Sequence, residues 1–462
     1  MMNTIAIQTV DQNAEILTDL AKKIWEHPET AFNEVKACEW TAEVLRNAGF
    51  DVEVGYCGMP TAIRATWGKG SPKIGFLGEY DALPGLSQKV STEKEAIIAG
   101  APGQGCAHNL LGVACVGAVL GMKAELEATG KEGTVVFYGC PAEEVLTGKA
   151  FMAREGAFAD LDAAFSWHGS TTNHVTLGTM TGLNSAVFHF HGITAHAGGD
   201  PHNGRSALDA VEITNIGANY LREHVTSDTR IHYVIKEGGT APNIVPDKAS
   251  VWYYVRAMSR EAVEDTYRRL VKCAEGAAHM TETKLEIEFK GGCYNTLNPV
   301  LLTNLTHDVM EQIELPQWTE EEKEFAEILN SKSQQYEVIK SKGLLENGPL
   351  CTFVSPVLNE DGYGSTDVGD VMHIVPCVQV MTATSNLAAP GHSWQITACA
   401  GMSIGMKGML YGAKVMAATA MKMVEDPEII AKAKEEFAKQ MNGKTYKCPI
   451  PKEIPVPQPE GC

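Results

Sequence analysis

The stretch TVVFYGCPAEE, residues 134–144, places a run of β-branched and aromatic residues directly before a turn and two adjacent glutamates. The run from 134 to 138 is typical of a buried β-strand, and the proline after it ends the strand. The segment AAFSWHG (163–169) repeats this arrangement, with an apolar run followed by His168. In open α/β sheets the functional crevice lies outside the carboxyl ends of the strands. Both segments therefore predict an α/β fold with polar side chains gathered at one edge of its sheet.

Two further motifs carry side chains of the types that bind transition metals. Cys106 and His108 lie in GCAHNLLG, and His392 lies in APGHSW. Thiolate, imidazole and carboxylate groups are the ligands of zinc and related ions in proteins. Each motif alone has an ordinary explanation, such as a buried cysteine, a core histidine or a turn residue. Together with His168 and the glutamate pair, they favour a metal-dependent hydrolase site.

The glutamate pair has the arrangement that metal-assisted hydrolysis requires. Adjacent carboxylates on a loop point in different directions, so that one can bind a metal ion while the other faces the attacking water. A base within reach of that water is needed to take its proton. A pair of exposed surface acids is the ordinary alternative for Glu143 and Glu144.

Strand-like and helical segments alternate through the first part of the chain. This alternation predicts a mainly parallel sheet with helices on both faces. The predicted strands are 62–67, 74–77, 134–138 and 163–167, and the predicted helices are two over 11–48, one at 110–122 and one near 149–155.

The order of strand-like and helical segments changes near residue 184. Four strand-like stretches and two helical ones follow, which predicts a small α+β (ferredoxin-like) domain of a sheet with two helices on one face. Its predicted strands are 185–190, 231–236, 249–256 and 284–290, with a helix at 260–279. We therefore expect a catalytic domain formed by residues 1–183 and 298–462, with residues 184–297 inserted as a second domain.

Composition restricts the partners and the compartment. The net charge of −19 argues against nucleic acid and anionic membrane surfaces, and any carboxylate recognition must come from a local cationic pocket. The apolar stretch 398–423 is interrupted by three lysines, so we expect a core helix and not a membrane span. The first residues show neither a basic nor an apolar leader pattern, which predicts a cytoplasmic protein with reduced cysteines.

Eight motifs, in this order, resemble the M20 metallopeptidase family, in the amidohydrolase branch that includes the aminobenzoyl-glutamate hydrolase B subunits. The resemblance covers roughly residues 10–425. The motifs are GEYDALPG, GCAHNLLG, PAEE, SWHG, AHAGGDPHNGRSALDAV, GGTAPNIVPDKA, STDVGDV and APGHS.

The resemblance implies a centre of two divalent ions, Mn or Zn, and a role for each matching residue. The implied metal ligands are Cys106, His108, Glu144, His168 and His392. The Cys106 thiolate would bridge the ions, and Glu143 would be the general base. Asp81 would orient one of the ligands, as carboxylates behind metal ligands do.

The resemblance also implies that the inserted domain is a lid and dimerisation domain. His196 would reach the oxyanion of the reaction, usually from the partner subunit, and the partner would be a second copy, with a hetero-subunit as the alternative. Asn243 and Arg256 would hold the carboxylate or carbonyl of the substrate. A surface ion pair is the ordinary alternative for Arg256.

Two departures from the branch concern the substrate. Met372-His373 follows STDVGDV where Ser-Trp is expected, and Cys140 precedes PAEE where Thr or Gln is more familiar. We expect both to lie near the substrate pocket, which weakens the case for aminobenzoyl-glutamate itself.

The sequence thus predicts an amidohydrolase that splits an amide between an acyl group, which we expect to be aromatic, and an amino acid. The alternatives within the enzyme class are a dipeptidase and an N-acyl-amino-acid deacylase. A non-catalytic binding subunit is the alternative of another class, and the complete ligand set with Glu143 argues against it. A thiol redox protein is disfavoured because the chain has no Cys-x-x-Cys pair.

Overall fold

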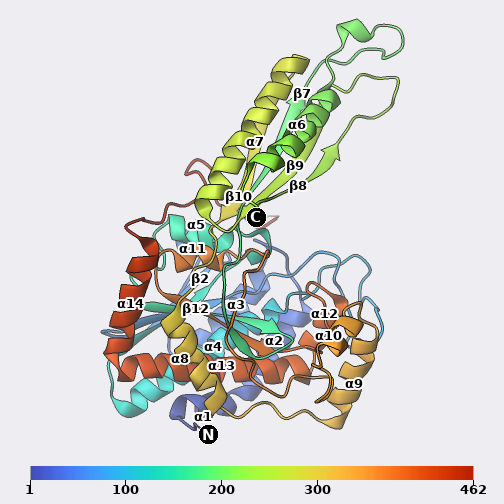
Figure 1. The fold of residues 1–462 in the computed structure, drawn as a ribbon. Coiled ribbons are helices and arrows are strands. Elements are labelled where there is room, and N and C mark those ends of the chain that lie inside the picture. Colours follow the sequence, from blue (N-terminus) through green and yellow to red (C-terminus); the bar gives the residue numbers. More distant parts are fainter. Residues whose placement is uncertain (1, 461–462) are drawn as a thin grey trace.

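The computed structural model describes residues 2–460, which form a large lower part and a narrow upper lobe (Figure 1). The large part contains an eight-stranded sheet in the order β1-β2-β4-β3-β5-β12-β6-β11, whose central strands β4, β3, β5 and β12 are parallel. The strands are β1 (Asp51–Val54), β2 (Ile63–Lys69), β3 (Lys73–Gly78), β4 (Gly133–Gly139), β5 (Ala163–Ser170), β6 (His174–Leu177), β11 (Leu358–Asn359) and β12 (Cys377–Ala383). The predicted α/β class with a mainly parallel sheet is confirmed.

The helices of this part pack on the sheet and enclose its main core. They are α1 (Ile5–Gln12), α2 (Ala14–Glu26), α3 (Val35–Asn47), α4 (His108–Thr129), α5 (Gly148–Arg154), α8 (Val300–Gln312), α9 (Glu320–Ser331), α10 (Tyr336–Ser341), α11 (Val368–Met372), α12 (Trp394–Ala400), α13 (Ser403–Glu425) and α14 (Pro427–Met441). The two helices predicted over residues 11–48 are α2 and α3, and the structure adds α1 before them, which ends at Gln12.

The long helix α4 lies in the middle of the core. From Leu110 to Met122 it is apolar around its whole circumference and buried on all sides, whereas its C-terminal end reaches the surface. A Cβ on Gly121 would lie 2.7 Å from the carbonyl oxygen of Ala6, so glycine lets α1 approach closely. Among the described residues, α4 alone is long and apolar enough to cross a membrane, and 89% of its most apolar window is buried inside the protein. Its buried start carries His108 to the edge of the sheet.

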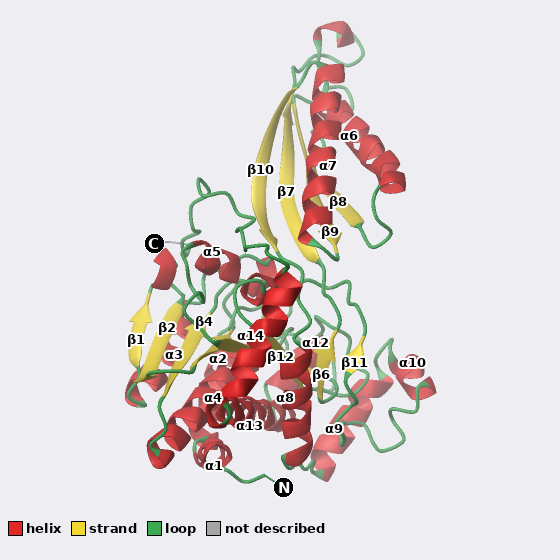
Figure 2. Cartoon of the chain, turned by 60° about the vertical axis from the view of Figure 1, so that its left-hand side comes forward, coloured by secondary structure: helices red, strands yellow, loops and turns green. Residues whose placement is uncertain are grey.

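The upper lobe is a four-stranded antiparallel sheet in the order β10-β7-β9-β8. Figure 2 shows that α6 and α7 cover one face of this sheet, where they form a separate core. The elements are β7 (Gly182–His191), α6 (Ala207–Leu221), β8 (Arg230–Glu237), β9 (Lys248–Ala257), α7 (Arg260–Thr281) and β10 (Lys284–Cys293). The strand β8 forms one edge of the sheet, and its Val234 and Ile235 are exposed.

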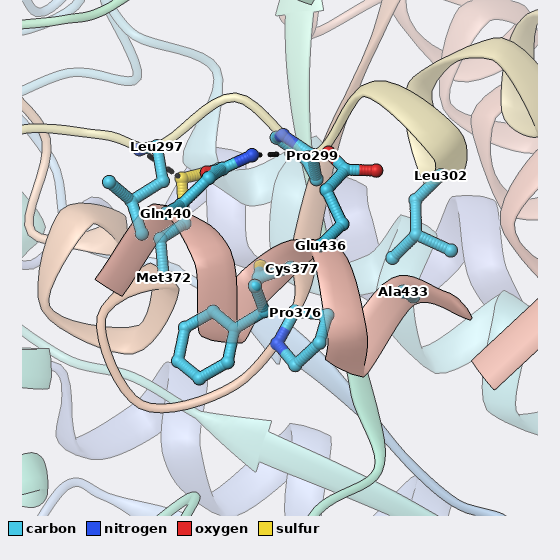
Figure 3. Close-up of a pocket in the computed structure, with 10 residues that line it drawn as sticks. Leu297, Pro299, Leu302, Met372, Pro376, Cys377, Ala433, Glu436 and Gln440 are labelled. Carbon is cyan, nitrogen blue, oxygen red and sulfur yellow. Dashed lines mark hydrogen bonds between the residues drawn. The ribbon is translucent and has the colours of Figure 1, made fainter. Parts of the chain in front are cut away.

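After β10 the chain re-enters the large part at a seam between α8 and α14. The carboxylate of Glu436 accepts hydrogen bonds from the backbone N–H groups of Val300 and Leu301, at 2.6 and 3.0 Å, and so caps α8. Figure 3 shows this seam, where Leu297 and Met372 line a cavity of about 10 Å³. That volume holds no more than a water molecule, so the seam joins the segments and binds no substrate.

Candidate metal centre

Side chains of the metal-binding types meet at the carboxyl ends of the parallel strands. Asp81 follows β3, Glu143 and Glu144 lie in a short 3₁₀ turn (Glu143–Val145) after β4, and His168 lies near the end of β5. Cys106 and His108 stand at the start of α4, and His392 lies in the loop between β12 and α12. The edge of the sheet predicted to carry the site therefore carries all of these residues.

The donor atoms form two sets that share one thiol. Cys106, His108 and His168 make the first set, and Cys106, Glu144 and His392 make the second, with the donor atoms of each set within 4.8 Å of one another. The Cys106 Sγ lies 3.2 Å from His168 Nε2, and His392 Nε2 lies 3.6 Å from Glu144 Oε2. These residues could hold two metal ions, and Cys106 would belong to both sets.

Neighbouring oxygens fix the orientation of the imidazole rings. His108 Nδ1 lies 3.0 Å from Asp81 Oδ1, and His168 Nδ1 lies 2.7 Å from the carbonyl oxygen of Gly169. Since these oxygens accept hydrogen bonds, each Nδ1 carries a hydrogen and each Nε2 is directed to the centre. The second oxygen of Asp81 accepts from the backbone N–H of Glu144 at 2.8 Å and so ties both donor sets together.

Two buried polar atoms at the centre have no hydrogen-bond partner. They are His108 Nε2 and Glu144 Oε1, which lie 4.0 Å apart. Buried polar atoms are nearly always paired, and an unpaired one calls for an ion or another partner. The residues present therefore fit a pair of divalent ions.

The pKa values of the acidic groups at the centre also favour bound cations. Burial raises the pKa of Glu143 well above its usual range, and the carboxylates of Glu79 and Asp367 raise it further. Burial also raises the pKa of Glu144 to about 7 and that of the Cys106 thiol to about 12. Metal binding requires Cys106 and Glu144 to lose their protons, and divalent cations would supply the positive charge that favours this loss.

The backbone at the centre is held in an unfavourable conformation. Left-handed φ angles occur at Ala107 (62°), Ala142 (60°), Leu146 (58°) and His392 (49°). For residues other than glycine, this conformation costs about 1–2 kcal/mol each, and such strain gathers at functional sites. The strained residues flank Cys106, His108 and the glutamate pair or, in the case of His392, carry the ligand itself.

The turn that holds the glutamates is supported from below. The buried carboxylate of Glu34 accepts from the backbone N–H of Ala142 at 2.8 Å and from the Thr61 hydroxyl at 3.0 Å. Helix α5 passes close beneath, because a Cβ on Gly148 would lie 1.7 Å from the carbonyl oxygen of Pro141. These contacts fix the direction of both carboxylates.

A buried ionic group next to the centre was not predicted from the sequence. Lys149 Nζ lies 2.5 Å from Glu79 Oε1 and 2.6 Å from Asp367 Oδ1, and all three residues are buried. Glu79 directly follows β3 within GEYDALPG, and Asp367 lies within STDVGDV, so both belong to motifs that the sequence displays. Nothing in the sequence indicates a functional role for Lys149, because it occupies an ordinary position in the short helix α5.

A cleft of about 490 Å³ opens onto the centre. Cys106, Glu143, Glu144, His168 and His392 all line it, and its size is typical of small-molecule sites. Apolar walls come from Leu146, Met180, Tyr254, Met381 and Ile396.

Arg256 is the only lysine or arginine side chain among the described residues that line this cleft. It stands at the end of β9, and its guanidinium donates to Ser365 Oγ at 3.1 Å. Within residues 2–460 no carboxylate forms an ion pair with it, so the structure does not place Arg256 in the surface ion pair considered above. Its free charge is available to a ligand.

The structure places the two other predicted lid residues outside this cleft. His196 and Asn243 are exposed on neighbouring loops, where the Asn243 carbonyl oxygen accepts from the N–H of Ala197 at 2.9 Å. The N–H groups of Gly198 and Gly199 donate to His196 Nδ1 at 3.2 and 2.9 Å. Because Nδ1 accepts, the ring hydrogen sits on Nε2, which can donate to a ligand.

The two departures noted in the sequence do not lie where we expected them. Neither Cys140 nor the pair Met372-His373 lines the cleft. Cys140 is buried and donates to the carbonyl oxygen of Tyr138. His373 packs against Tyr294 at the junction of the two parts. These residues therefore give no reason to exclude a substrate.

Comparisons with known proteins agree with this geometry. A family model described as the peptidase dimerisation domain matches residues 179–281, which cover most of the upper lobe. The chain is 39% identical to the B subunit of p-aminobenzoyl-glutamate hydrolase from Escherichia coli, over 97% of each chain. It is 30% identical to the mouse Xaa-Arg dipeptidase, over 94% of this chain and 91% of the dipeptidase.

Two solved structures share the fold. The aminobenzoyl-glutamate utilization protein of Klebsiella pneumoniae superposes with a TM-score of 0.61 at 16% identity, covering 90% of this chain and 97% of that one. The YXEP protein of Bacillus subtilis, described as a dinuclear metal binding peptidase, superposes with a TM-score of 0.59 at 16% identity, covering 90% and 99%.

Proposed function

We propose that this chain, which belongs to the M20 family of metal-dependent amidohydrolases and peptidases, cleaves an aromatic acyl group from an amino acid. p-Aminobenzoyl-glutamate is the first candidate substrate, because the Escherichia coli relative is named for its hydrolysis. The observation that carries the proposal is the convergence of two thiol-sharing donor sets, Glu143 and Arg256 on one cleft with apolar walls.

Cys106, His108 and His168 would hold one ion, and Cys106, Glu144 and His392 the other. When bound, a pair of divalent ions polarises the scissile carbonyl and makes water a stronger nucleophile. Thiolate, imidazole and carboxylate together suit both Mn and Zn, and we propose that one of these two fills the site.

Glu143 would act as the general base. Its carboxylate lies 3.9 Å from His108 Nε2, beside the ligands but outside both donor sets that share Cys106. It would take the proton of the attacking water and deliver it to the amine that leaves. Burial raises the pKa of Glu143, which favours its keeping the proton between these two steps.

Arg256 would bind the carboxylate of the amino-acid half of the substrate. Its guanidinium is held by Ser365 and lies over the ring of Tyr254, with 5.5 Å between the guanidinium carbon and the ring centroid. A planar guanidinium pairs with a carboxylate through two parallel hydrogen bonds. The apolar walls would then receive the acyl group.

His196 would complete the site of a second copy of the chain, and Asn243 beside it would contact the substrate there. The exposed position of both residues and the available Nε2–H donor of His196 support this arrangement. The exposed apolar edge strand β8 supports pairing between two lobes. We propose a homodimer, with a hetero-subunit as the alternative partner.

We also propose a cytoplasmic location. The cysteines of residues 2–460 are free thiols, and Cys106 must stay reduced to bind metal. Reducing compartments keep thiols in that state.

Hydrolysis of a small panel tests the proposal. Purified protein loaded with Mn or Zn would be given p-aminobenzoyl-glutamate, benzoyl-glycine and a dipeptide ending in arginine. We expect release of p-aminobenzoate, with weaker cleavage of the others. Cleavage of the dipeptide alone would replace the proposed substrate class with that of the mouse relative.

A further inference from the structure

Glu79 places a carboxylate oxygen against a metal-binding atom. Its side chain is 2% exposed, and its Oε1 contacts Lys149 Nζ at 2.5 Å. The other oxygen, Oε2, lies 3.4 Å from His108 Nε2. Lys149 thus holds one oxygen of this carboxylate and leaves the second directed at the centre.

Carboxyl oxygens of three residues lie within about 4 Å of His108 Nε2. Asp81 occupies the opposite ring nitrogen, and the oxygens near Nε2 belong to Glu79, Glu143 (3.9 Å) and Glu144 (4.0 Å). No hydrogen bond reaches Nε2, although the ring is fully buried. An atom that faces several carboxylate oxygens without a hydrogen bond is best satisfied by a cation.

The spacing fits two ligands of one ion. Ligand nitrogen and oxygen atoms bind zinc at about 2.0–2.2 Å, so that two ligands of a tetrahedral ion lie roughly 3.4 Å apart. The observed separation of 3.4 Å between His108 Nε2 and Glu79 Oε2 equals this value. Glu79, His108 and Glu143 also form a set of donor atoms within 4.8 Å of one another.

We propose that Glu79 is a further ligand of the ion held by His108, an inference that rests on the metal-dependent function proposed above. Lys149 is its positioning residue. It bonds to Asp367 through both Nζ and its backbone N–H, at 2.6 and 2.8 Å, so its ammonium group cannot follow Glu79 if that side chain moves.

The extra carboxylate changes which ion fits best. Cys106, His108 and His168 alone offer one sulfur and two nitrogens, which suits tetrahedral zinc. A carboxylate oxygen adds negative charge and a further ligand, and oxygen ligands suit Mn. The loss of Glu79 therefore weakens Mn binding more than Zn binding at this position.

Metal binding by three variants tests the assignment. Glu79→Gln removes the charge and leaves Lys149 paired with Asp367, whereas Glu79→Asp keeps the charge and shortens the reach by one methylene. Glu322→Gln is the matched control, because Glu322 is a buried carboxylate paired with Lys407 outside the centre. Metal-free proteins would be dialysed against MnCl₂ or ZnCl₂, and bound metal measured by elemental analysis and Mn electron paramagnetic resonance.

We expect about two Mn ions per chain in the wild type and in the control. In Glu79→Gln one Mn site should weaken by more than roughly 100-fold, beyond the 10- to 100-fold loss usual for a carboxylate that only supports a ligand, and the spectrum of a coupled Mn pair should be lost. In Glu79→Asp the same site should weaken as well. Two-site Mn binding within about twofold of wild type in Glu79→Gln would overturn the assignment. Wild-type affinity in Glu79→Asp would also overturn it, since charge alone would then explain the role.

The outcome is separable from that of the proposed function. If the wild type bound two ions but cleaved no amide, the proposed function would be wrong. The metal measurements on the Glu79 variants would still decide whether Glu79 is a ligand.

Discussion

The large part of the molecule and the upper lobe differ in where they place their candidate functional residues. In the large part, Cys106, Glu144 and His392 come from separate segments and meet within one cleft. In the lobe, His196 and Asn243 lie exposed on neighbouring loops, outside the cleft that opens onto the centre. One chain therefore gathers the metal-binding groups by itself and exposes His196 and Asn243. This difference is what we expect if a second copy completes the site, as proposed above.

The removal of the base tests the large part most severely. Glu143→Gln keeps the size of the side chain and should retain metal, because Glu143 lies outside both thiol-sharing donor sets. Turnover should fall by roughly 10²- to 10⁴-fold, the usual contribution of a general base. The measurement is kcat on the cleaved amide together with metal content, with Glu127→Gln on the exposed face of α4 as control. Near-normal turnover would remove Glu143 from its role.

The removal of His196 tests the lobe. His196→Ala should leave metal content unchanged and lower kcat by about 10²- to 10³-fold, as the loss of an oxyanion donor does. Mixing this variant with Glu143→Gln in equal amounts tests whether His196 acts in the site of the partner subunit. If the histidine acts across subunits, half of the dimers contain one intact site, and activity returns to about a quarter of wild type. Mixtures without any recovery would place His196 in the site of its own chain.

Arg256 links the two parts, because it belongs to the lobe and yet lines the cleft. Arg256→Lys keeps the charge and loses the planar pair of donors, so kcat/KM should fall by roughly 10-fold with most of the change in KM. Arg268→Lys, in an exposed pair on α7, is the matched control. An unchanged KM would show that Arg256 does not bind the substrate carboxylate.

The smallest effect concerns the junction of the two parts. Burial raises the pKa of Asp370 to about 7, and its oxygens accept from the Tyr446 hydroxyl at 2.7 Å and from the N–H of Tyr294 at 3.1 Å. A carboxyl whose folded-state pKa is raised stabilises the protein fully below its unfolded pKa, and this contribution disappears as the pH rises through about 7.

Asp370→Asn cannot ionise, so the stability of the wild type relative to this variant should fall by roughly 1–3 kcal/mol from pH 5 to pH 7. Urea unfolding of both proteins at the two pH values measures this change. A constant difference between them would mean that Asp370 does not titrate in this range.

The strands of the large part show which elements could be predicted from the sequence and which could not. The strands β3, β4 and β5 were predictable because each is a continuous apolar run, as parallel strands buried on both faces are. β12 was missed, although it carries the chain to His392, because its CVQVMTA pattern mixes polar with apolar residues. The family, the fold class and the metal-dependent hydrolysis of amides are confirmed.

The ion pairs that Lys149 forms with Glu79 and Asp367 could not be predicted from the residues around each position in the sequence. Lys149 looks like any residue of a short helix, and its partner Asp367 lies 218 residues away in the sequence. Such a contact exists only after the sheet brings α5 and α11 together. Glu79 was within reach, since it follows β3 as Asp81 does, but nothing local separates a ligand from a carboxylate that supports one.

Metal content and amide hydrolysis, measured together on the wild type and on Cys106→Ala, test the central claim most directly. The account predicts about two Mn or Zn ions per wild-type chain with release of p-aminobenzoate, and fewer ions with no turnover in the variant, because both donor sets share this thiol. A wild type that stays metal-free and inactive after Mn or Zn is added would contradict it. Full metal content and activity in the variant would do the same.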